Sequence, residues 1–230
     1  MNILIIGAAR GVGRHLAEQA LARGHHVTGL VLDPLGAGFS RRNLRLVGGT
    51  IVSCAAVAEA VKGQDAICIT IGIGPTRAPV DVFSRGTEVV LAAMRHAGVH
   101  RLVCVTGIGA GDSRGHGGGL YDRIVQPLLL NSIYADKDRQ ETLVRASDVN
   151  WTLVRPGFLT NWPGTGRYRI SADLTGITAR KISRADVASY LLREMTTSMD
   201  AGRTVLVDGE TEARISADRD LRQTAGASLE

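Results

Sequence analysis

The sequence has few aromatic residues, few cysteines and no long apolar run. Aromatic residues make up 4% of the 230 residues, and the cysteines, Cys54, Cys68 and Cys104, are odd in number. A disulfide framework and a metal site are therefore both disfavoured, and we expect reduced thiols, with Cys68 and Cys104 in buried strands. No stretch approaches the roughly 18 apolar residues that a membrane helix needs, so no membrane partner is expected.

The sequence also lacks clusters of basic residues. Its net charge of +5 comes from arginines scattered along the chain, without the block of lysines and arginines that is typical of nucleic-acid or membrane patches. We therefore expect a mild attraction for anionic ligands, no nucleic-acid partner, and a monomer or homodimer. The first residues indicate a core strand rather than a signal peptide, which predicts a cytoplasmic protein.

Glycine, by contrast, is abundant, with 28 residues in the chain. Residues 3–6 are an unbroken apolar run, typical of a strand buried on both faces of a parallel sheet. Gly7, Gly11 and Gly13 follow, and then a helix that ends at Gly24. Such a turn lets a pyrophosphate approach the backbone, where helix N–H groups hold its charge and where a branched side chain would block it. The alternative, a tight turn that binds nothing, needs one glycine rather than three.

Several residues bear on the choice between NADP and NAD. Arg10 precedes the second glycine, and a guanidinium there is a donor for the additional phosphate of NADP. Asp33 follows the second expected strand, where a carboxylate binds the ribose of NAD, but Asp33-Pro34 is also a plain turn initiator, which we favour. Arg41 and Arg42, on the same loop, are within possible reach of an adenosine phosphate. We therefore expect NADPH to be preferred, with NAD as the alternative.

The rest of the chain alternates between apolar strands and helices. Further strands are expected at residues 26–32, 44–47, 66–71, 101–106, 151–154 and 204–207. Helices are expected at residues 55–61, 80–97 and 134–147, and another begins after Ser183 as its N-cap. Pro127 predicts a kink or two helical pieces within residues 120–130, and residues 211–230 form a polar tail. The alternation predicts a single α/β domain over residues 1–210, a doubly wound, mostly parallel, Rossmann-like sheet.

Glycine-rich segments follow two of these strands. Ile71 and Gly72 lie at the end of the fourth strand, and the loop 107–119 follows the fifth. The carboxyl ends of parallel strands form the crevice in which such sheets bind ligands, so we expect these segments to line the site. His116 is a candidate acid or base in this loop, although a lone loop histidine is more often solvated.

The series of motifs resembles the short-chain dehydrogenase/reductase family. It runs GAARGVG, LVLDP, AVKGQDAICITIG, RLVCVTGIGAGDSRGHGG, YADKDRQETLVRASDVNWTLVRPG and RKISRADVA, over about the first 208 residues. The chain looks most like an atypical group that includes flavin reductase/biliverdin-IXβ reductase-like and NmrA-like NAD(P)-binding proteins. The resemblance implies a Rossmann-like fold, with nicotinamide near the ends of strands four to six. It implies cofactor contacts from Gly7, Ala9, Arg10, Gly11, Val12, Gly13, Ile71, Gly72, Lys137, Pro156 and Gly157.

The expected catalytic residues depart from the pattern of this family. Its main branch uses a serine together with Y-x-x-x-K, whereas Tyr134 and Lys137 are spaced Y-x-x-K. Lys137 takes the family's lysine position, which implies that it holds the nicotinamide ribose. Ile133 stands where the tyrosine would be, and Gly107 stands where relatives often have serine. Because a shift of one residue rotates Tyr134 by about 100° around the helix, it cannot simply substitute. The catalytic candidates are Lys137, Thr106 and Tyr134.

This weakened proton relay favours one class of acceptor. A ketone that accepts hydride becomes a strongly basic alkoxide and needs a tuned proton donor, whereas a quinone, flavin or bilin yields a delocalised, weakly basic anion. The sequence therefore predicts an NADPH-dependent reductase of a conjugated planar acceptor: a quinone, an aromatic polyketide or a flavin-like molecule. Phe158, Trp162 and Tyr168 are candidates to stack on it. The alternatives are an NmrA-like regulator that senses NADP without turnover, and a ketoreductase or epimerase of the same family.

Overall fold

The computed structural model describes residues 1–38, 40–76, 78–119, 121–123 and 130–210. Its strands are β1 (Asn2–Ile6), β2 (His26–Val31), β3 (Leu44–Gly48), β4 (Ala66–Ile69), β5 (Arg101–Val105), β6 (Asn150–Pro156), β7 (Phe158–Thr160), β8 (Tyr168–Ser171), β9 (Lys181–Ser183) and β10 (Arg203–Gly209). Its helices are α1 (Gly11–Ala22), α2 (Cys54–Val61), α3 (Val82–Ala97), α4 (Asn131–Arg145) and α5 (Arg184–Thr197), with a short 3-10 helix at Gly111–Ser113.

The fold is the predicted doubly wound, mostly parallel α/β domain. An eight-stranded sheet has the order β3-β2-β1-β4-β5-β6-β10-β8, and only the β10–β8 pair within it is antiparallel. The short strands β7 and β9 form a separate parallel pair. The strand order reverses between β1 and β4, which opens a crevice at their carboxyl ends.

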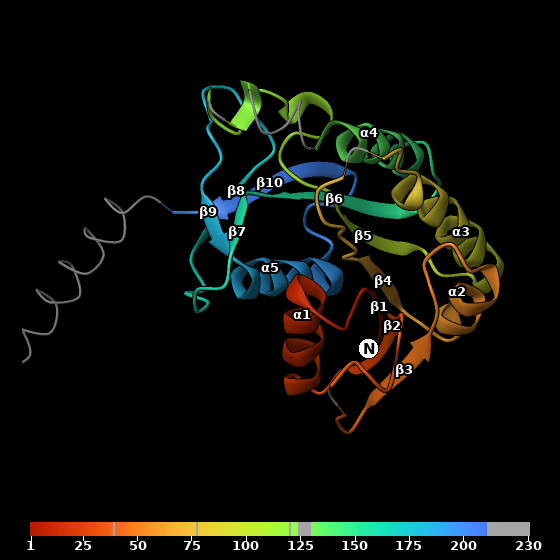
Figure 1. The fold of residues 1–230 in the computed structure, drawn as a ribbon. Helices are drawn as coiled ribbons and strands as arrows, with labels where there is room; N and C mark the ends of the chain where they lie inside the picture. Colours follow the sequence, from red (N-terminus) through yellow and green to blue (C-terminus); the bar gives the residue numbers. More distant parts are fainter. Residues whose placement is uncertain (39, 77, 120, 124–129, 211–230) are drawn as a thin grey trace, which may run out of the picture.

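Helices cover both faces of the sheet. Figure 1 shows α1 and α5 on one side and α2, α3 and α4 on the other. Ile3 and Ile5 of β1 belong to the core on the α1 and α5 side, whereas Leu4 and Ile6 belong to the core on the opposite side. Because side chains alternate along a strand, a strand buried on both faces needs the unbroken apolar run found there.

The sequence pattern missed the short strands β7, β8 and β9. Each has three or four residues, too few for a visible period, and forms only against distant partners such as β10. The fourth strand ends at Ile69, so the predicted site residues Ile71 and Gly72 lie beyond it. Pro127 and the tail 211–230 lie outside the described residues.

The predicted environment of the cysteines is confirmed. Cys68 and Cys104 are buried and free, and Cys54 is free and exposed. Burial raises the pKa of Cys104 to about 12. Among the described residues no helix is long and apolar enough to cross a membrane.

A buried ion pair joins the sheet to α5. Arg101, at the start of β5, donates from Nη2 to Glu194 Oε1 at 2.6 Å and to Thr152 Oγ1 at 2.9 Å. All three residues are buried. Burial lowers the pKa of Arg101, and the Glu194 carboxylate opposes this shift. Neither charge can be removed alone without leaving the other unpaired.

Glu194→Ala is therefore expected to lower the free energy of unfolding by about 3–5 kcal/mol, because it leaves Arg101 charged, buried and unpaired. Urea unfolding measures the change. Glu59→Ala is the matched control, since it removes the exposed partner of Arg45, and little change is expected. Equal stability losses in the two variants would contradict this assignment.

Candidate active site

The segment from Gly7 to Gly13, here called the glycine loop, leads from β1 into the first turn of α1 at the crevice. Gly7 and Gly11 have φ angles of +96° and +60°, which favour glycine. At Gly13 the constraint is close packing, since a Cβ would lie 2.2 Å from the Gly7 carbonyl oxygen and 2.4 Å from Thr70 Oγ1. Thr70 in turn donates to the Ile6 carbonyl at 2.9 Å. The expected obstruction by a side chain at Gly13 is therefore a clash with the protein's own backbone.

The start of α1 fits an anionic ligand. Its N-cap, Arg10, has an extended backbone and makes no capping hydrogen bond through its side chain, and the first turn carries no acidic residue. Such a start leaves helix N–H groups for a phosphate. After β4, a Cβ on Gly72 or Gly74 would meet nothing within 4 Å, so the backbone there faces open space. This cradle suits a dinucleotide between the ends of β1 and β4.

Ala9, Val12 and Ile71 support this cradle through packing. Val12 is buried in the core beside α5, and Ala9 packs against the same cluster. Ile71 packs on the glycine loop, since its Cγ2 lies 3.3 Å from where a Cβ on Gly7 would be. The structure thus brings together the predicted cofactor residues that follow β1 and β4.

Asp33 adopts the turn that we favoured. Its Oδ1 accepts a hydrogen bond from the Leu35 N–H at 3.0 Å, which closes a local turn after β2. A Cβ on Gly36 would lie 2.4 Å from Asp33 Oδ2, so the carboxylate packs into this turn. The Asp33 carboxylate therefore stabilises its own turn, which weakens the argument for NAD based on its position.

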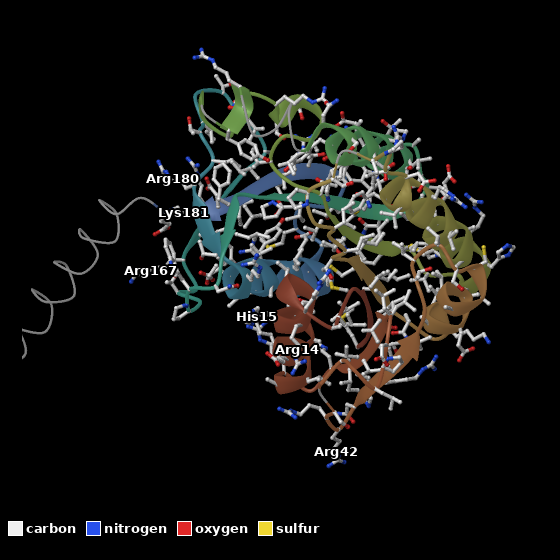
Figure 2. All side chains as sticks on the ribbon, in the orientation of Figure 1. Arg14, His15, Arg42, Arg167, Arg180 and Lys181 are labelled. Carbon is white, nitrogen blue, oxygen red and sulfur yellow. The ribbon has the colours of Figure 1, made fainter. Side chains whose placement is uncertain are left out.

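The structure contradicts the predicted contact of Arg41 and Arg42 with an adenosine phosphate. Both precede Asn43, whose carbonyl accepts a hydrogen bond from the Val27 N–H at the start of β2. They therefore lie at the amino ends of the strands, whereas the glycine loop lies at the carboxyl ends. The six residues of β2 separate the two edges by roughly 20 Å. Figure 2 shows Arg42 pointing out of the molecule.

Arg14 lies nearer the expected adenosine side and was missed by the sequence analysis. It follows Gly13 on α1 and donates from Nη1 to the Ala37 carbonyl, at 3.1 Å, on the loop after β2. It also pairs with Glu18 at 2.6 Å. Figure 2 shows it on α1 beside His15. An arginine on a helix surface carries no distinguishing pattern, so only the contact with Ala37 reveals its place.

Lys137 lies deep in the site, beside the end of β5. Its Nζ donates to the Thr106 carbonyl at 2.8 Å and lies 4.3 Å from the centroid of the Phe83 ring. Burial lowers the pKa of Lys137 to about 8, although Cys104, Glu141 and Asp136 act in the opposite direction. An ammonium has three N–H bonds, so two remain for a ligand such as the ribose hydroxyls.

Asp136 fixes α4 against the start of α3. It is wholly buried and accepts hydrogen bonds from the Phe83 N–H at 2.8 Å and from the Ser84 hydroxyl. Negative charge is favourable at a helix N-terminus, so this carboxylate stabilises the first turn of α3. This contact keeps the Phe83 ring next to the Lys137 side chain.

The Thr106 hydroxyl is bonded to a neighbouring carboxylate rather than directed at a hydride-accepting substrate. Its Oγ1 donates to Glu141 Oε1 at 2.8 Å, and Arg155 holds the same carboxylate through contacts of 2.9 Å and 2.6 Å. All three residues are buried. Because a hydroxyl has one proton, this arrangement leaves none for a substrate, so the structure does not support Thr106, a catalytic candidate, as a proton donor. Thr106 instead anchors the end of β5.

Pro156 and Gly157 follow Arg155 at the end of β6, as predicted. A Cβ on Gly157 would lie 2.1 Å from the Arg180 carbonyl oxygen, so a glycine is needed where the chain meets the segment leading into β9. The Pro156 carbonyl accepts from the Ile108 N–H at 3.4 Å. These contacts place the turn next to the end of β5 and therefore beside Lys137.

Tyr134 reaches the end of β5 in spite of its shifted spacing. A Cβ on Gly107 would lie 3.3 Å from the Tyr134 hydroxyl, so the phenol fills space beside a residue without a side chain. The Tyr134 and Tyr121 hydroxyls are 2.9 Å apart. Burial raises the pKa of Tyr134 above its ordinary value, and Tyr121 adds to the rise. Tyr134 is near the expected reaction centre, but it is a weak acid.

Tyr121 is a second residue that the sequence analysis missed. Its ring packs edge-on against Phe158, with the centroids 5.1 Å apart. The segment between β5 and α4 has no regular apolar period, so nothing in it singles out Tyr121. Together with Tyr134, these rings form an aromatic cluster at the ends of β5 and β6.

The other aromatic and histidine candidates lie elsewhere. Trp162 is 59% exposed, with its ring 5.6 Å from Lys181 Nζ. Tyr168 packs edge-on against Tyr190 of α5 at 6.1 Å. The Nδ1 atom of His116 is 2.7 Å from the Ile177 carbonyl oxygen, so the half-buried ring links two loops.

A cleft of about 490 Å³ is separate from the crevice. It contains neither a residue of the glycine loop nor Lys137. Its lining is formed by Asp112, Arg145, Trp151, Arg155, Ala172, Leu174, Gly202, Thr204 and Leu206.

Comparison with known proteins identifies the cofactor class. Residues 7–198 match a family described as NAD(P)H-binding. A Bacillus subtilis protein named as an uncharacterized sugar epimerase, YhfK, is 30% identical over 161 residues, which are 67% of this chain and 68% of that protein. The family match confirms the predicted NAD(P)-binding class and supports an NAD(P)H-dependent oxidoreductase.

Solved structures confirm the fold. A wide-type short-chain dehydrogenase/reductase from Veillonella parvula, in complex with NADP, has a TM-score of 0.77 at 16% identity, covering 92% of this chain and 95% of that one. ChuY from Escherichia coli O157:H7, described as an anaerobilin reductase, has a TM-score of 0.75 at 20% identity, covering 90% and 97%.

Gly13→Ala is expected to weaken NADPH binding by about tenfold or more and to lower the free energy of unfolding by about 1–3 kcal/mol, because its Cβ collides with the Gly7 carbonyl. Fluorescence titration and urea unfolding measure the two effects. Gly72→Ala is the stability control, since its Cβ would meet open space. Unchanged affinity in Gly13→Ala would place the nucleotide elsewhere.

NADPH binding is expected to weaken as the pH rises through about 8, the pKa of Lys137, because the ammonium that we expect to hold the nicotinamide ribose loses its proton there. The pKa lies below that of free lysine, so the charged form is present below about pH 8 and lost above it. Titrations between about pH 7 and about pH 9.5 test this. Lys137→Met is the control, with weak binding and no such dependence. A flat profile in the wild type would rule the role out.

Proposed function

The chain belongs to the NAD(P)H-binding family, and from this premise we propose that it is an NADPH-dependent reductase of a conjugated planar acceptor. The acceptor class is a quinone, an aromatic polyketide or a flavin-like molecule. The observation that carries the proposal is the scarcity of good proton donors among the described residues at the end of β5. The Thr106 proton is used on Glu141, Gly107 has no side chain, and burial raises the pKa of Tyr134.

The acceptor class follows from the basicity of the reduced product. A bound nicotinamide cofactor supplies the hydride. An alkoxide formed from a simple ketone would need a nearby acid, and Tyr134 with its raised pKa is a poor one. A conjugated acceptor spreads the charge and can be protonated by water. The rings of Tyr121, Tyr134 and Phe158 offer it a surface for stacking.

In this mechanism the chain's own residues bind and orient the cofactor and exclude water. The glycine loop holds the cofactor phosphates, and Lys137 directs its two remaining N–H bonds to the ribose. Orientation of this kind lowers the barrier because reacting atoms are held close together. Glu141 and Arg155 keep Thr106, and with it the carbonyl that holds Lys137, in place.

The preference for NADPH is part of the proposal. Arg10 is exposed at the start of α1, and Arg14 reaches the loop after β2. We infer that both bind the additional phosphate of NADP. Asp33, which would favour NAD, is engaged in its own turn. We also propose that the protein acts in the cytoplasm on a small molecule, without nucleic acid or membrane, as a monomer or homodimer.

A second candidate is an epimerase or ketoreductase, because the Bacillus subtilis relative is named as a sugar epimerase. The buried Ile133 and the absent side chain at Gly107 argue against the standard relay of that group. An NADP-sensing regulator would bind the cofactor without turnover, and no contact in the site favours it.

The test is NADPH and NADH oxidation with a panel of quinones, flavins, ketones and nucleotide sugars. We expect turnover with a quinone or flavin, and a lower KM for NADPH than for NADH. Tyr134→Phe and Tyr121→Phe should keep most of this activity, because water supplies the proton, whereas Lys137→Ala should lose both cofactor affinity and turnover.

Two results would overturn this function. A folded Tyr134→Phe protein that binds NADPH but has no activity would show that the phenol is the proton donor, and ketones would become the leading substrates. Tight NADPH binding without turnover of any acceptor would favour the regulator.

A further inference from the structure

Arg184, the first residue of α5, lies against the glycine loop. Its Nε is 3.9 Å from the position that a Cβ on Gly11 would occupy, and its Nη1 donates to Asn161 Oδ1 at 2.7 Å. We propose that Arg184 binds the diphosphate of the cofactor and that Asn161 is a positioning residue that orients its guanidinium. Neither residue was expected in the site from the sequence.

The charge of Arg184 points to an anionic ligand. The side chain is half-buried, and among the described residues it forms no ion pair. Partly buried charges are usually paired, because removal from water is unfavourable. Beside Arg184 is the start of α1, which would also attract an anion because Arg10 leaves the helix without a side-chain cap.

The position of Arg184 is rigidly determined. Ser183 caps α5 by accepting from the Asp186 N–H at 2.9 Å, and Gln19 of α1 donates to the Ala185 carbonyl at 2.9 Å. These contacts hold the first turn of α5 beside α1. With its backbone held and Nη1 bonded to Asn161, the guanidinium needs less ordering when an anion binds, which favours affinity.

The loop that contains Asn161 is fastened to the same turn of α5. Asp186 accepts hydrogen bonds from the backbone N–H groups of Thr165 and Gly166 at 2.8 Å and 2.7 Å, which fastens the loop that follows β7. Arg184 thus bridges this loop and the glycine loop. With one nitrogen on Asn161, its remaining N–H groups are the donors for a phosphate oxygen.

The diphosphate is common to NADPH and NADH, and this distinguishes Arg184 from Arg10. Arg184→Gln should weaken the binding of both cofactors by the same factor, about tenfold or more. Arg10→Ala should instead reduce the ratio between the two affinities. This proposal rests on NAD(P)H binding by the family and not on the identity of the hydride acceptor. The activity test with quinones, flavins, ketones and nucleotide sugars can therefore fail without affecting it.

The experiment is fluorescence titration of NADPH and NADH, with calorimetric titration of ADP-ribose, which keeps the diphosphate, and of adenosine, which has none. Arg184→Gln should weaken the binding of NADPH, NADH and ADP-ribose and leave the affinity for adenosine unchanged. Arg184→Lys should recover part of the loss because it keeps the charge. Asn161→Ala should cause a smaller loss, and the double variant should bind about as weakly as Arg184→Gln, because both act through one guanidinium.

Arg95→Gln is the matched control for net charge. Arg95 is exposed in the last turn of α3, which leads to the amino end of β5, away from the crevice. Its loss should change no affinity, and thermal unfolding should show that every variant is folded. Affinity of Arg184→Gln within twofold of the wild type, or a loss restricted to NADPH, would overturn the proposal.

Discussion

The rest of the site depends on the close contact between Gly13 and the Gly7 carbonyl. With no side chain between them, α1 begins directly above the ends of β1 and β4, where the Thr70 hydroxyl closes the gap. The uncapped N–H groups of α1 therefore face the crevice at the point where the strand order reverses. The proposed cofactor contacts of Lys137 and Arg184 depend on this packing, because it determines where the phosphates can lie.

Burial sets the chemistry on the opposite side of the crevice. It lowers the pKa of Lys137 and raises that of Tyr134, because a charged form is disfavoured away from water in both cases. The same environment keeps the Glu141–Arg155 pair tightly bonded and occupies the Thr106 hydroxyl. The site is consequently well supplied with groups that orient a ligand and poorly supplied with groups that donate a proton to it.

Three arginines from different parts of the chain surround one helix start. Arg10 is the N-cap of α1 and Arg14 lies on that helix, whereas Arg184 comes from α5. The first turn of α1 has no acidic residue, so the field at its N-terminus remains positive. This distribution fits the proposed binding mode, in which the diphosphate contacts Arg184 and the adenosine side lies towards Arg14.

The sequence alone determined the parts of the protein that depend on near neighbours. The apolar run before Gly7, the glycine spacing and the Ser183 cap each involve residues a few positions apart, and all were predicted. Only the tertiary structure decided the positions of Arg42 and Arg184 and the partner of the Thr106 hydroxyl. Their partners or positions depend on segments far along the chain that the strand order of the sheet brings together. The local spacing of apolar residues carries no information about such contacts. A side chain's chemistry can be read from its type, but its target depends on which distant backbone lies beside it.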